Sequence, residues 1–371
     1  MLSTKKEVNE MQKTLSEMAR YLQKMLPPEI PVNFEIDVMF HDIADDESIR
    51  KGVLAFRDFM YRLYSRLSAK GGPFDKPKKE AHEFSDSANI ASSYPFISNI
   101  AVILTNIGLH GKLNDDRDAM ALDGIESLTA ENNVSNAKIP DARKVECLRF
   151  LTDCGIRFAG LDLSAAKPAL STRAPIVITY PDHPDMLTGL KVMATAQRDM
   201  KVTFIQDILL RCDYRVLANK DIEILPLLKD LLNPLPADVR EFIVKLHRDY
   251  LGNGYRCETS VNNNVRFTYF CRSKELWRFN ISVNNGHNIT IKANNASQYP
   301  DTVEKLPQWL QEKIAKGYGC GKKMGRTPSC DGGCRGYRIP LDDSFMEISE
   351  LVRAWIGEEV SCIDKGRNLC P

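Results

Sequence analysis

The stretch from residue 255 to residue 293 carries the clearest structural signal in the chain. In four successive runs, large apolar or aromatic side chains occupy every second position, the spacing that places them on one face of a β-strand. The runs are Tyr255-Arg-Cys-Glu-Thr-Ser-Val261, Val265-Arg-Phe-Thr-Tyr-Phe-Cys271, Trp277-Arg-Phe-Asn-Ile-Ser-Val283 and Ile289-Thr-Ile-Lys-Ala293. Short polar segments separate them, and Asn285-Gly286 is a dipeptide favoured in tight hairpin turns, whose central residues need positive φ. A four-stranded antiparallel meander with one buried face is therefore predicted.

Three predicted helices provide a second layer for that face. One covers Ala237 to Leu251, after the boundary signal Asn233-Pro-Leu-Pro-Ala237. Another begins at Asp301-Thr-Val-Glu304 and continues past Ile314. A capping-box pattern, Ser344-Phe-Met-Glu347, predicts the start of the third. Residues 233–371 are therefore expected to form a two-layer α+β domain.

The aromatic positions of the meander allow two interpretations. Tyr255, Phe267, Tyr269 and Trp277 either line a ligand-binding or base-stacking surface or form the core beneath the helices. The available helices favour the core. The basic side chains of the same strands, Arg266, Arg272, Arg278 and Lys292, are then expected on the opposite face or at the edges.

Residues 94–232 are predicted to form a helical, winged-helix-like module. Helices are expected at Phe96–Leu109, Ala119–Ala130 and Asp141–Cys154, followed by strands at Ile156–Leu161 and Ile176–Tyr180. Three helices and a hairpin in this order are typical of a winged helix, which makes a DNA-binding regulator one alternative function. The third helix mixes acidic with basic residues, however, and this is a poor surface for phosphates. Nucleic acid is therefore not the favoured partner.

Residues 1–93 are predicted to form a helix, a strand and a second helix. The first helix begins at Thr4 and shows heptad spacing from Val8 to Met25, which indicates either homodimerisation through a coiled coil or packing within its own domain. Alternating residues from Val32 to Phe40 predict a strand, and an apolar stripe predicts a helix at Glu47–Leu67.

Length and composition agree with a multi-domain α+β protein. A chain of 371 residues exceeds one ordinary hydrophobic core, and 43% hydrophobic with 27% charged residues is typical of globular proteins. The net charge of +1 gives no overall attraction to nucleic acid or to anionic membranes. No signal peptide or apolar stretch of membrane-spanning length is found, so the expected location is cytoplasmic, with no membrane partner.

The segment from Gly317 to Gly336 is the most distinctive chemically. It is rich in glycine and contains three cysteines, Cys320, Cys330 and Cys334. Cys330 and Cys334 are separated by three residues, a spacing found in zinc sites. We therefore consider a zinc site with these three ligands and a fourth from Cys362, Cys370, His287 or a meander cysteine.

Two other interpretations of this loop remain open. Its backbone amides and its cations, Lys322, Lys323, Arg326 and Arg335, are able to hold a small anion as a cofactor or ligand. The same cations also lower the pKa of a thiol and so favour a reactive thiolate. The simplest alternative is a surface loop with incidental cysteines.

Common catalytic motifs are absent from the sequence, and its six histidines are scattered. His41, His183 and the pair Asp342-Asp343 lie at expected helix starts, where acidic residues have a structural role. These observations favour a non-enzymatic ligand- or metal-binding regulatory protein. A thiolate- or zinc-dependent enzyme acting on a small molecule is the alternative.

Overall fold

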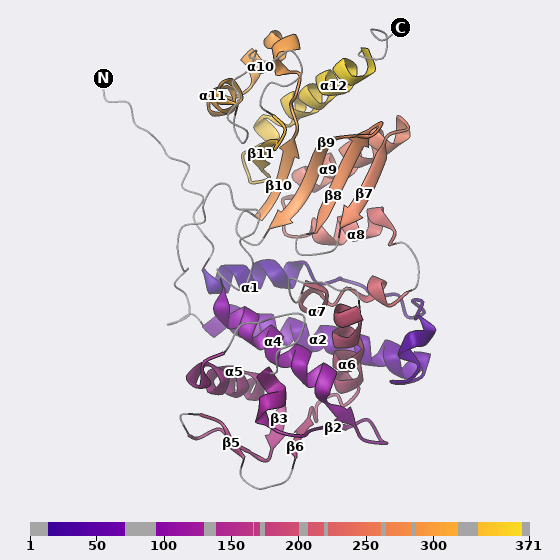
Figure 1. Cartoon of the computed structure of the whole chain (residues 1–371), viewed down its shortest axis with the longest axis vertical. Helices are drawn as coiled ribbons and strands as arrows, with labels where there is room; N and C mark the ends of the chain where they lie inside the picture. Colours follow the sequence, from indigo (N-terminus) through magenta and orange to yellow (C-terminus); the bar gives the residue numbers. More distant parts are fainter. Residues whose placement is uncertain are drawn as a thin grey trace, which may run out of the picture. The chain divides into compact units, whose positions relative to one another are not determined.

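The structure is a computed structural model, and it describes residues 14–70, 94–129, 139–165, 167–170, 175–199, 207–218, 222–260, 265–282, 286–317 and 333–365. The chain forms two compact units that divide between Leu231 and Leu232 (Figure 1). We call them the N-terminal unit and the C-terminal unit. Both combine helices with antiparallel strands, so the α+β class predicted from the sequence is confirmed.

The N-terminal unit is mainly helical. Its helices are α1 (Leu15–Lys24), α2 (Asp46–Lys70), α4 (Pro95–His110), α5 (Asp141–Asp153), α6 (Met186–Asp199), α7 (Asp207–Arg211) and α8 (Ile224–Leu231). The predicted apolar stripe of α2 is buried along its length, from Ile49 to Leu67, because it packs on α1 and α6. The predictions for α2, α4 and α5 are confirmed, and Gly155, with φ of 108°, follows the C-terminal end of α5.

Glycines allow α6 to approach α2 and α4 closely. A Cβ atom on Gly189 of α6 would lie 2.0 Å from the carbonyl oxygen of Gly52 on α2. A Cβ atom on Gly108 of α4 would lie 2.5 Å from the Cβ of Ala194 on α6. The backbones of α2 and α6 are therefore in direct contact, and no larger residue fits at this crossing without displacing a helix.

A small antiparallel sheet completes the N-terminal unit. Its strand order is β1 (Lys112–Leu113), β2 (Ala119–Leu122), β6 (Ile176–Thr179) and β3 (Arg157–Ala159), and β4 (Leu161–Asp162) pairs separately with β5 (Ala169–Leu170). The predicted pairing of two strands after α5 is confirmed, but the helix predicted at Ala119–Ala130 is wrong. Met120 and Leu122 are buried at alternating positions in β2, and only the 3-10 helix η2 (Ile125–Thr129) follows. The three-helix order of a winged helix is therefore not observed.

The helix α1 packs within its own unit. A capping box formed by Thr14 and Glu17 starts it, and residues 1–13, including the predicted start at Thr4, lie outside the described residues. The seam positions Leu15, Met18 and Leu22 are buried, and the Gln23 side-chain amide donates to the Tyr61 carbonyl of α2 at 3.0 Å. In this part of the seam, packing on α2 occupies the surface that the predicted dimer would use.

The strand predicted at Val32–Phe40 is wrong. This segment is irregular and ends in the 3-10 helix η1 (Val38–Phe40), capped by the Asp37 side chain, which accepts from the Met39 amide. Val32 is 80% exposed and Val38 75% exposed, and of the five apolar alternating positions only Phe34 and Phe40 are buried. Phe34 and Phe40 each anchor the segment separately, and their spacing in the sequence resembles the alternation of a strand although no strand forms.

The C-terminal unit contains a five-stranded antiparallel sheet. The strand order is β11 (Tyr337–Pro340), β10 (Gly286–Ile291), β9 (Lys274–Ser282), β8 (Arg266–Cys271) and β7 (Arg256–Ser260) (Figure 1). The predicted four-stranded meander is confirmed, and β11, which follows the Gly/Cys-rich segment, adds a fifth strand beside β10.

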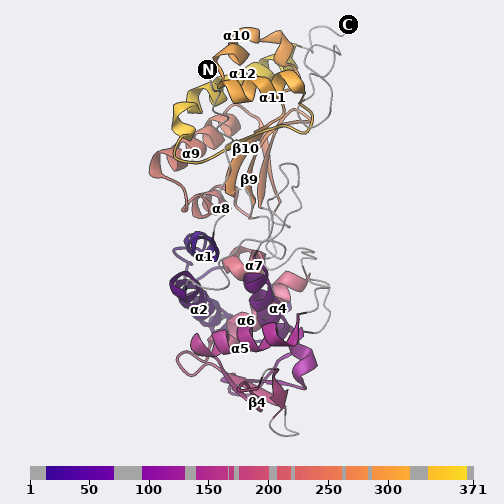
Figure 2. The same ribbon diagram turned by 90° about the vertical axis from the view of Figure 1, so that its left-hand side faces the viewer.

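The helices of this unit are α9 (Ala237–Gly252), α10 (Pro300–Lys305), α11 (Gln308–Lys316) and α12 (Ser349–Lys365), with the 3-10 helices η4 (Ala296–Gln298) and η5 (Phe345–Glu347). In Figure 2, α9 lies along one side of β9 and β10. Tyr250 of α9 contacts Trp277 of β9, and Trp355 of α12 contacts Tyr337 of β11, with ring centroids 5.7 and 5.9 Å apart. The helices α9 and α12 therefore cover the aromatic face of the sheet.

Two predicted helix boundaries in this unit need correction. The helix expected from Asp301 past Ile314 is broken into α10 and α11, because Pro307 cannot continue a helix and constrains Leu306 before it. The capping box expected at Ser344 and Glu347 is also wrong. These residues frame η5, and α12 begins only at Ser349.

Candidate functional site

The face of the C-terminal sheet that points away from α9 is lined by polar and basic side chains. Strand register places two rows of residues on it. Thr268, Arg278, Thr290 and Arg338 form one row across β8, β9, β10 and β11, and Arg266, Asn280 and Asn288 form the next row across β8, β9 and β10. Glu275 and Lys292 lie beside the first row, on the side away from the second row. We call this set of nine residues the polar face.

Several residues of the polar face are buried, although they point away from the aromatic core. Asn288 is 1% exposed, Thr290 2% and Asn280 8%, and the side chain of Arg278 is 12% exposed. Gly336, with φ of 81°, lies so close to Thr290 that an added Cβ atom would be 2.4 Å from the threonine methyl group. The centre of the polar face is therefore buried, with Gly336 packed against Thr290.

The neutral residues at this centre form a hydrogen-bonded cluster. The side-chain amide of Asn280 donates to Asn288 Oδ1 at 3.2 Å and to Thr290 Oγ1 at 3.1 Å. The Thr290 hydroxyl donates in turn to Asn288 Oδ1 at 3.3 Å. These mutual contacts fix the orientation of three side chains on two neighbouring strands, which is the preorganisation that a binding site needs.

Charged residues surround the neutral cluster. Glu275 lies 2.6 Å from Lys292 Nζ and 3.6 Å from Arg278 Nη1, so one carboxylate is shared between two cations. The Nε atom of Arg266 is buried and makes no hydrogen bond within the described part of the chain. A buried guanidinium donor without an acceptor is costly, and a ligand acceptor would remove this cost.

The edge of this face at β7 has a different character. Arg256 and Glu258 are more than half exposed and form an ion pair with each other. The Arg256 guanidinium also lies over the Phe270 ring, 4.6 Å from its centroid. An exposed pair of this kind contributes little to stability, so Arg256 offers a matched control for the basic residues of the polar face.

The residues predicted in the Gly/Cys-rich segment are only partly described. Cys320, Lys322, Lys323 and Cys330 lie outside the described residues, whereas Cys334 and Arg335 are exposed immediately before β11. Burial raises the pKa of Cys362 on α12, which disfavours its thiolate. In the described ranges, no three His, Cys, Asp or Glu residues are grouped as metal ligands. The zinc site therefore remains a prediction, and the segment leads directly into the strand that carries Arg338.

The aromatic residues of the meander form the core, as the sequence favours. The ring of Tyr269 stacks on Trp277 with centroids 3.5 Å apart and an interplanar angle of 4°. The Tyr269 hydroxyl lies 2.9 Å from His247 Nδ1 on α9 and also forms a hydrogen bond with the Cys257 thiol. Burial raises the pKa of Cys257 to about 12 and lowers that of His247. Both groups are therefore uncharged at neutral pH within this core.

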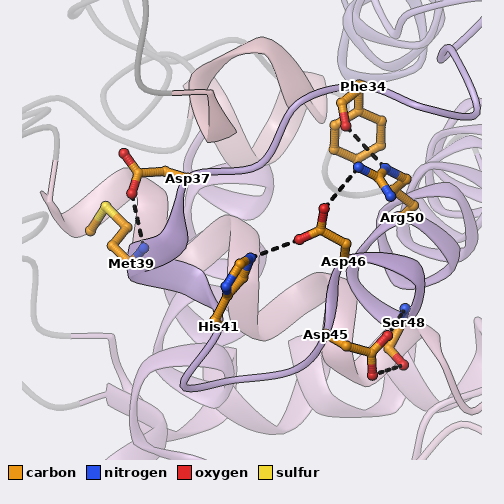
Figure 3. A network of polar contacts seen from close by, with 8 residues as sticks. All are labelled: Phe34, Asp37, Met39, His41, Asp45, Asp46, Ser48 and Arg50. Atoms are coloured by element: carbon orange, nitrogen blue, oxygen red, sulfur yellow. Dashed lines mark hydrogen bonds and ion pairs between the residues drawn. The ribbon is translucent and has the colours of Figure 1, made fainter.

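The histidine and aspartate pairs at helix starts have structural contacts. Figure 3 shows His41 Nε2 bound to Asp46 at 2.7 Å, and Arg50 bound to the same carboxylate at 3.0 Å. Asp45 accepts from the Ser48 amide and hydroxyl, and these hydrogen bonds hold the pKa of Asp45 well below its usual range. This is helix capping at the start of α2, as expected.

The other two pairs are similar. His183 lies 3.7 Å from Asp185, one residue before α6, and Asp182 forms an ion pair with Arg62 of α2. Asp342 accepts from the amide and hydroxyl of Ser344, as in an Asx turn. These contacts agree with the structural role that their positions indicate.

A buried carboxylate on α12 escaped the sequence analysis. Glu359 is fully buried and accepts from the Asn295 amide at 2.9 Å, from the Asn295 side chain at 2.8 Å and from the Tyr299 hydroxyl. Trp355 Nε1 donates to the same hydroxyl at 3.0 Å. Burial raises the pKa of Glu359 despite these donors. The network ties α12 to the segment after β10, so its role is structural.

Comparisons with known proteins add no functional information to this geometry. No protein-family model matches the chain, and no curated protein or solved structure is significantly similar to it. Among the described helices, none is both long and apolar enough to cross a membrane.

Proposed function

We propose that this protein is a ligand-binding regulatory protein that holds a small polar molecule on the polar face of its C-terminal sheet. The observation that carries this proposal is the hydrogen-bonded cluster of Asn280, Asn288 and Thr290, which is buried beside Arg266 and Arg278. A sheet face that serves only for packing gains most from apolar side chains, because each buried polar group must recover its lost hydration. Departures from that rule are expected at functional sites.

The burial of the polar face favours a small ligand over a nucleic acid. A nucleic acid needs an exposed basic surface that follows its phosphate backbone. Here Asn288 and Thr290 are buried, and the aromatic rings available for stacking on bases, Tyr269 and Trp277, are buried on the opposite face. Buried hydrogen-bonding groups of fixed orientation are typical of small-molecule sites.

The experiment is a thermal-shift screen of the full chain against amino acids, dicarboxylates, sugars, sugar phosphates and nucleosides, with each stabilising compound measured by calorimetry. We expect at least one compound to bind, and we expect the variant Asn280→Leu to lose at least about tenfold in affinity, because hydrogen bonds in a buried site are worth roughly 1–3 kcal/mol each.

The matched control is Arg256→Gln, at the exposed β7 edge of the same sheet. It should bind the compound as the unaltered protein does. Equal affinities for Asn280→Leu and the unaltered protein would place the bound compound elsewhere and contradict the proposal.

A further inference from the structure

We infer that the ligand of the polar face carries an oxyanion, a carboxylate or phosphate group, and that Arg266 binds it together with Arg278. This inference rests on the proposed function and specifies the chemistry of the same site. It starts from the charges: the polar face carries the cations Arg266, Arg278, Lys292 and Arg338 and the carboxylate Glu275, while Arg256 and Glu258 pair with each other at its β7 edge.

Glu275 is already shared between two of the cations. Both Lys292 and Arg278 contact Glu275, at 2.6 and 3.6 Å. Arg266 belongs to the opposite end of the face, beside Asn280, and its buried Nε makes no hydrogen bond to a described residue. An anionic acceptor at this end would satisfy Nε with a charge-assisted hydrogen bond.

Strand geometry brings the arginines within reach of one small molecule. Arg266 and Arg278 stand on the neighbouring strands β8 and β9, which are separated by about 4.8 Å, and Arg338 stands two strands beyond Arg278. The amides and the hydroxyl of Asn280, Asn288 and Thr290 lie between the arginine positions of β8 and β11. A fork of guanidinium donors binds a carboxylate or phosphate in a bidentate manner, while the neutral cluster hydrogen-bonds the uncharged part of the ligand.

The test compares probes that differ in charge. Succinate and succinamide have the same carbon skeleton, but only succinate carries carboxylates, and inorganic phosphate supplies the other oxyanion. Binding of each to the full chain is measured by calorimetry at low ionic strength, for the unaltered protein, for Arg266→Gln and for the control Arg256→Gln. Unfolding midpoints of the variants establish that each one is folded.

We expect succinate or phosphate to bind, succinamide to bind at least about tenfold more weakly, and Arg266→Gln to reduce oxyanion affinity about tenfold or more while Arg256→Gln does not. A stronger response to phosphate than to succinate would identify the ligand as a phosphate compound, and the reverse would identify a carboxylate.

Two results would overturn the inference. One is the absence of oxyanion binding at millimolar concentrations, or oxyanion binding that Arg266→Gln leaves unchanged. The other is succinamide binding as tightly as succinate with a loss in Asn280→Leu, which would leave the proposed ligand-binding function intact and show that the ligand is neutral.

Discussion

The two faces of the C-terminal sheet are built from the same strands, but one buries aromatic side chains and the other buries polar ones. On one face Tyr269 stacks on Trp277, and α9 and α12 cover the rings. On the other face Asn280, Asn288 and Thr290 are almost as deeply buried, yet they are polar and are flanked by arginines. Burial alone therefore does not identify a hydrophobic core in this unit.

This contrast separates residues that stabilise the unit from residues available for binding. Aromatic burial contributes directly to folding, whereas buried amides and guanidinium groups only recover the hydration that they lose. Stability measurements should therefore respond strongly to changes on the aromatic face and weakly to changes on the polar face, with binding showing the opposite pattern. All three tryptophans, Trp277, Trp309 and Trp355, lie in the C-terminal unit, so their fluorescence reports its unfolding selectively.

The largest effect is expected for Trp277→Ala on the aromatic face. Trp277 is fully buried, and its truncation should lower the free energy of unfolding by about 3–5 kcal/mol, because it leaves a large cavity under α9. Urea unfolding followed by the fluorescence of Trp309 and Trp355 measures this loss. The control is Thr268→Ala on the polar face, and a similar loss in both variants would remove the contrast between the faces.

A smaller effect is expected for Tyr269→Phe. This change keeps the stacked ring but removes the hydroxyl that contacts His247 Nδ1 at 2.9 Å, and it should cost about 1–3 kcal/mol because a buried polar atom loses its partner. Tyr255→Phe, at the less buried rim of the same cluster, provides the comparison. Equal unfolding midpoints for Tyr269→Phe and the unaltered protein would show that ring packing alone holds this face.

His247 makes the aromatic face sensitive to pH. Burial lowers its pKa below the ordinary value of 6.5, so at pH values below 6.5 the unfolded chain binds a proton more readily than the folded chain does. The stabilisation due to neutral His247 is complete above pH 6.5 and is lost as the pH falls through 6.5 toward the lower folded-state pKa. Urea unfolding across this range should show a steeper loss for the unaltered protein than for His247→Gln, and parallel curves would contradict this assignment.

The smallest change in stability is expected on the polar face. Asn280→Leu should alter the free energy of unfolding by less than about 1 kcal/mol, because Thr290 still donates to Asn288 after the change. Ligand affinity, in contrast, should fall at least about tenfold. A destabilisation as large as that of Trp277→Ala would instead assign the polar cluster a structural role.

Sequence patterns predicted the aromatic face well because its signal is local. Each strand from β7 to β10 carries its own alternation, and the dipeptide Asn285-Gly286 predicts a turn directly before β10. The polar face was predicted only as the opposite face or edges that would hold Arg266, Arg272, Arg278 and Lys292, and of these Arg272 instead binds Asp364 and the Ile363 carbonyl on α12. Its burial depends on residues distant in sequence, such as Gly336 over Thr290, and periodicity within a strand contains no such information.

The other misassignments also arise where contacts between residues distant in sequence decide the structure. Met120 and Leu122 fit a helical pattern as well as a strand, and pairing with β6 decides between the two. Apolar and polar residues alternate from Val32 to Phe40, but no strand of the described structure pairs with this segment. The alternation therefore does not lead to a strand. Glu359 gave no signal, because a single acidic residue on an amphipathic helix is normally exposed, and only the fold brings Asn295 and Tyr299 to it.

The position of β11 has a consequence for the order of folding. Short connections link each strand from β7 to β10 to the next one in the chain, whereas residues 292–336 separate β10 from β11. Closing this long loop costs entropy before β11 gains its hydrogen bonds, so the meander is expected to form first and β11 to dock late. Arg338 arrives with that last strand, so we expect the polar face to be completed late in folding.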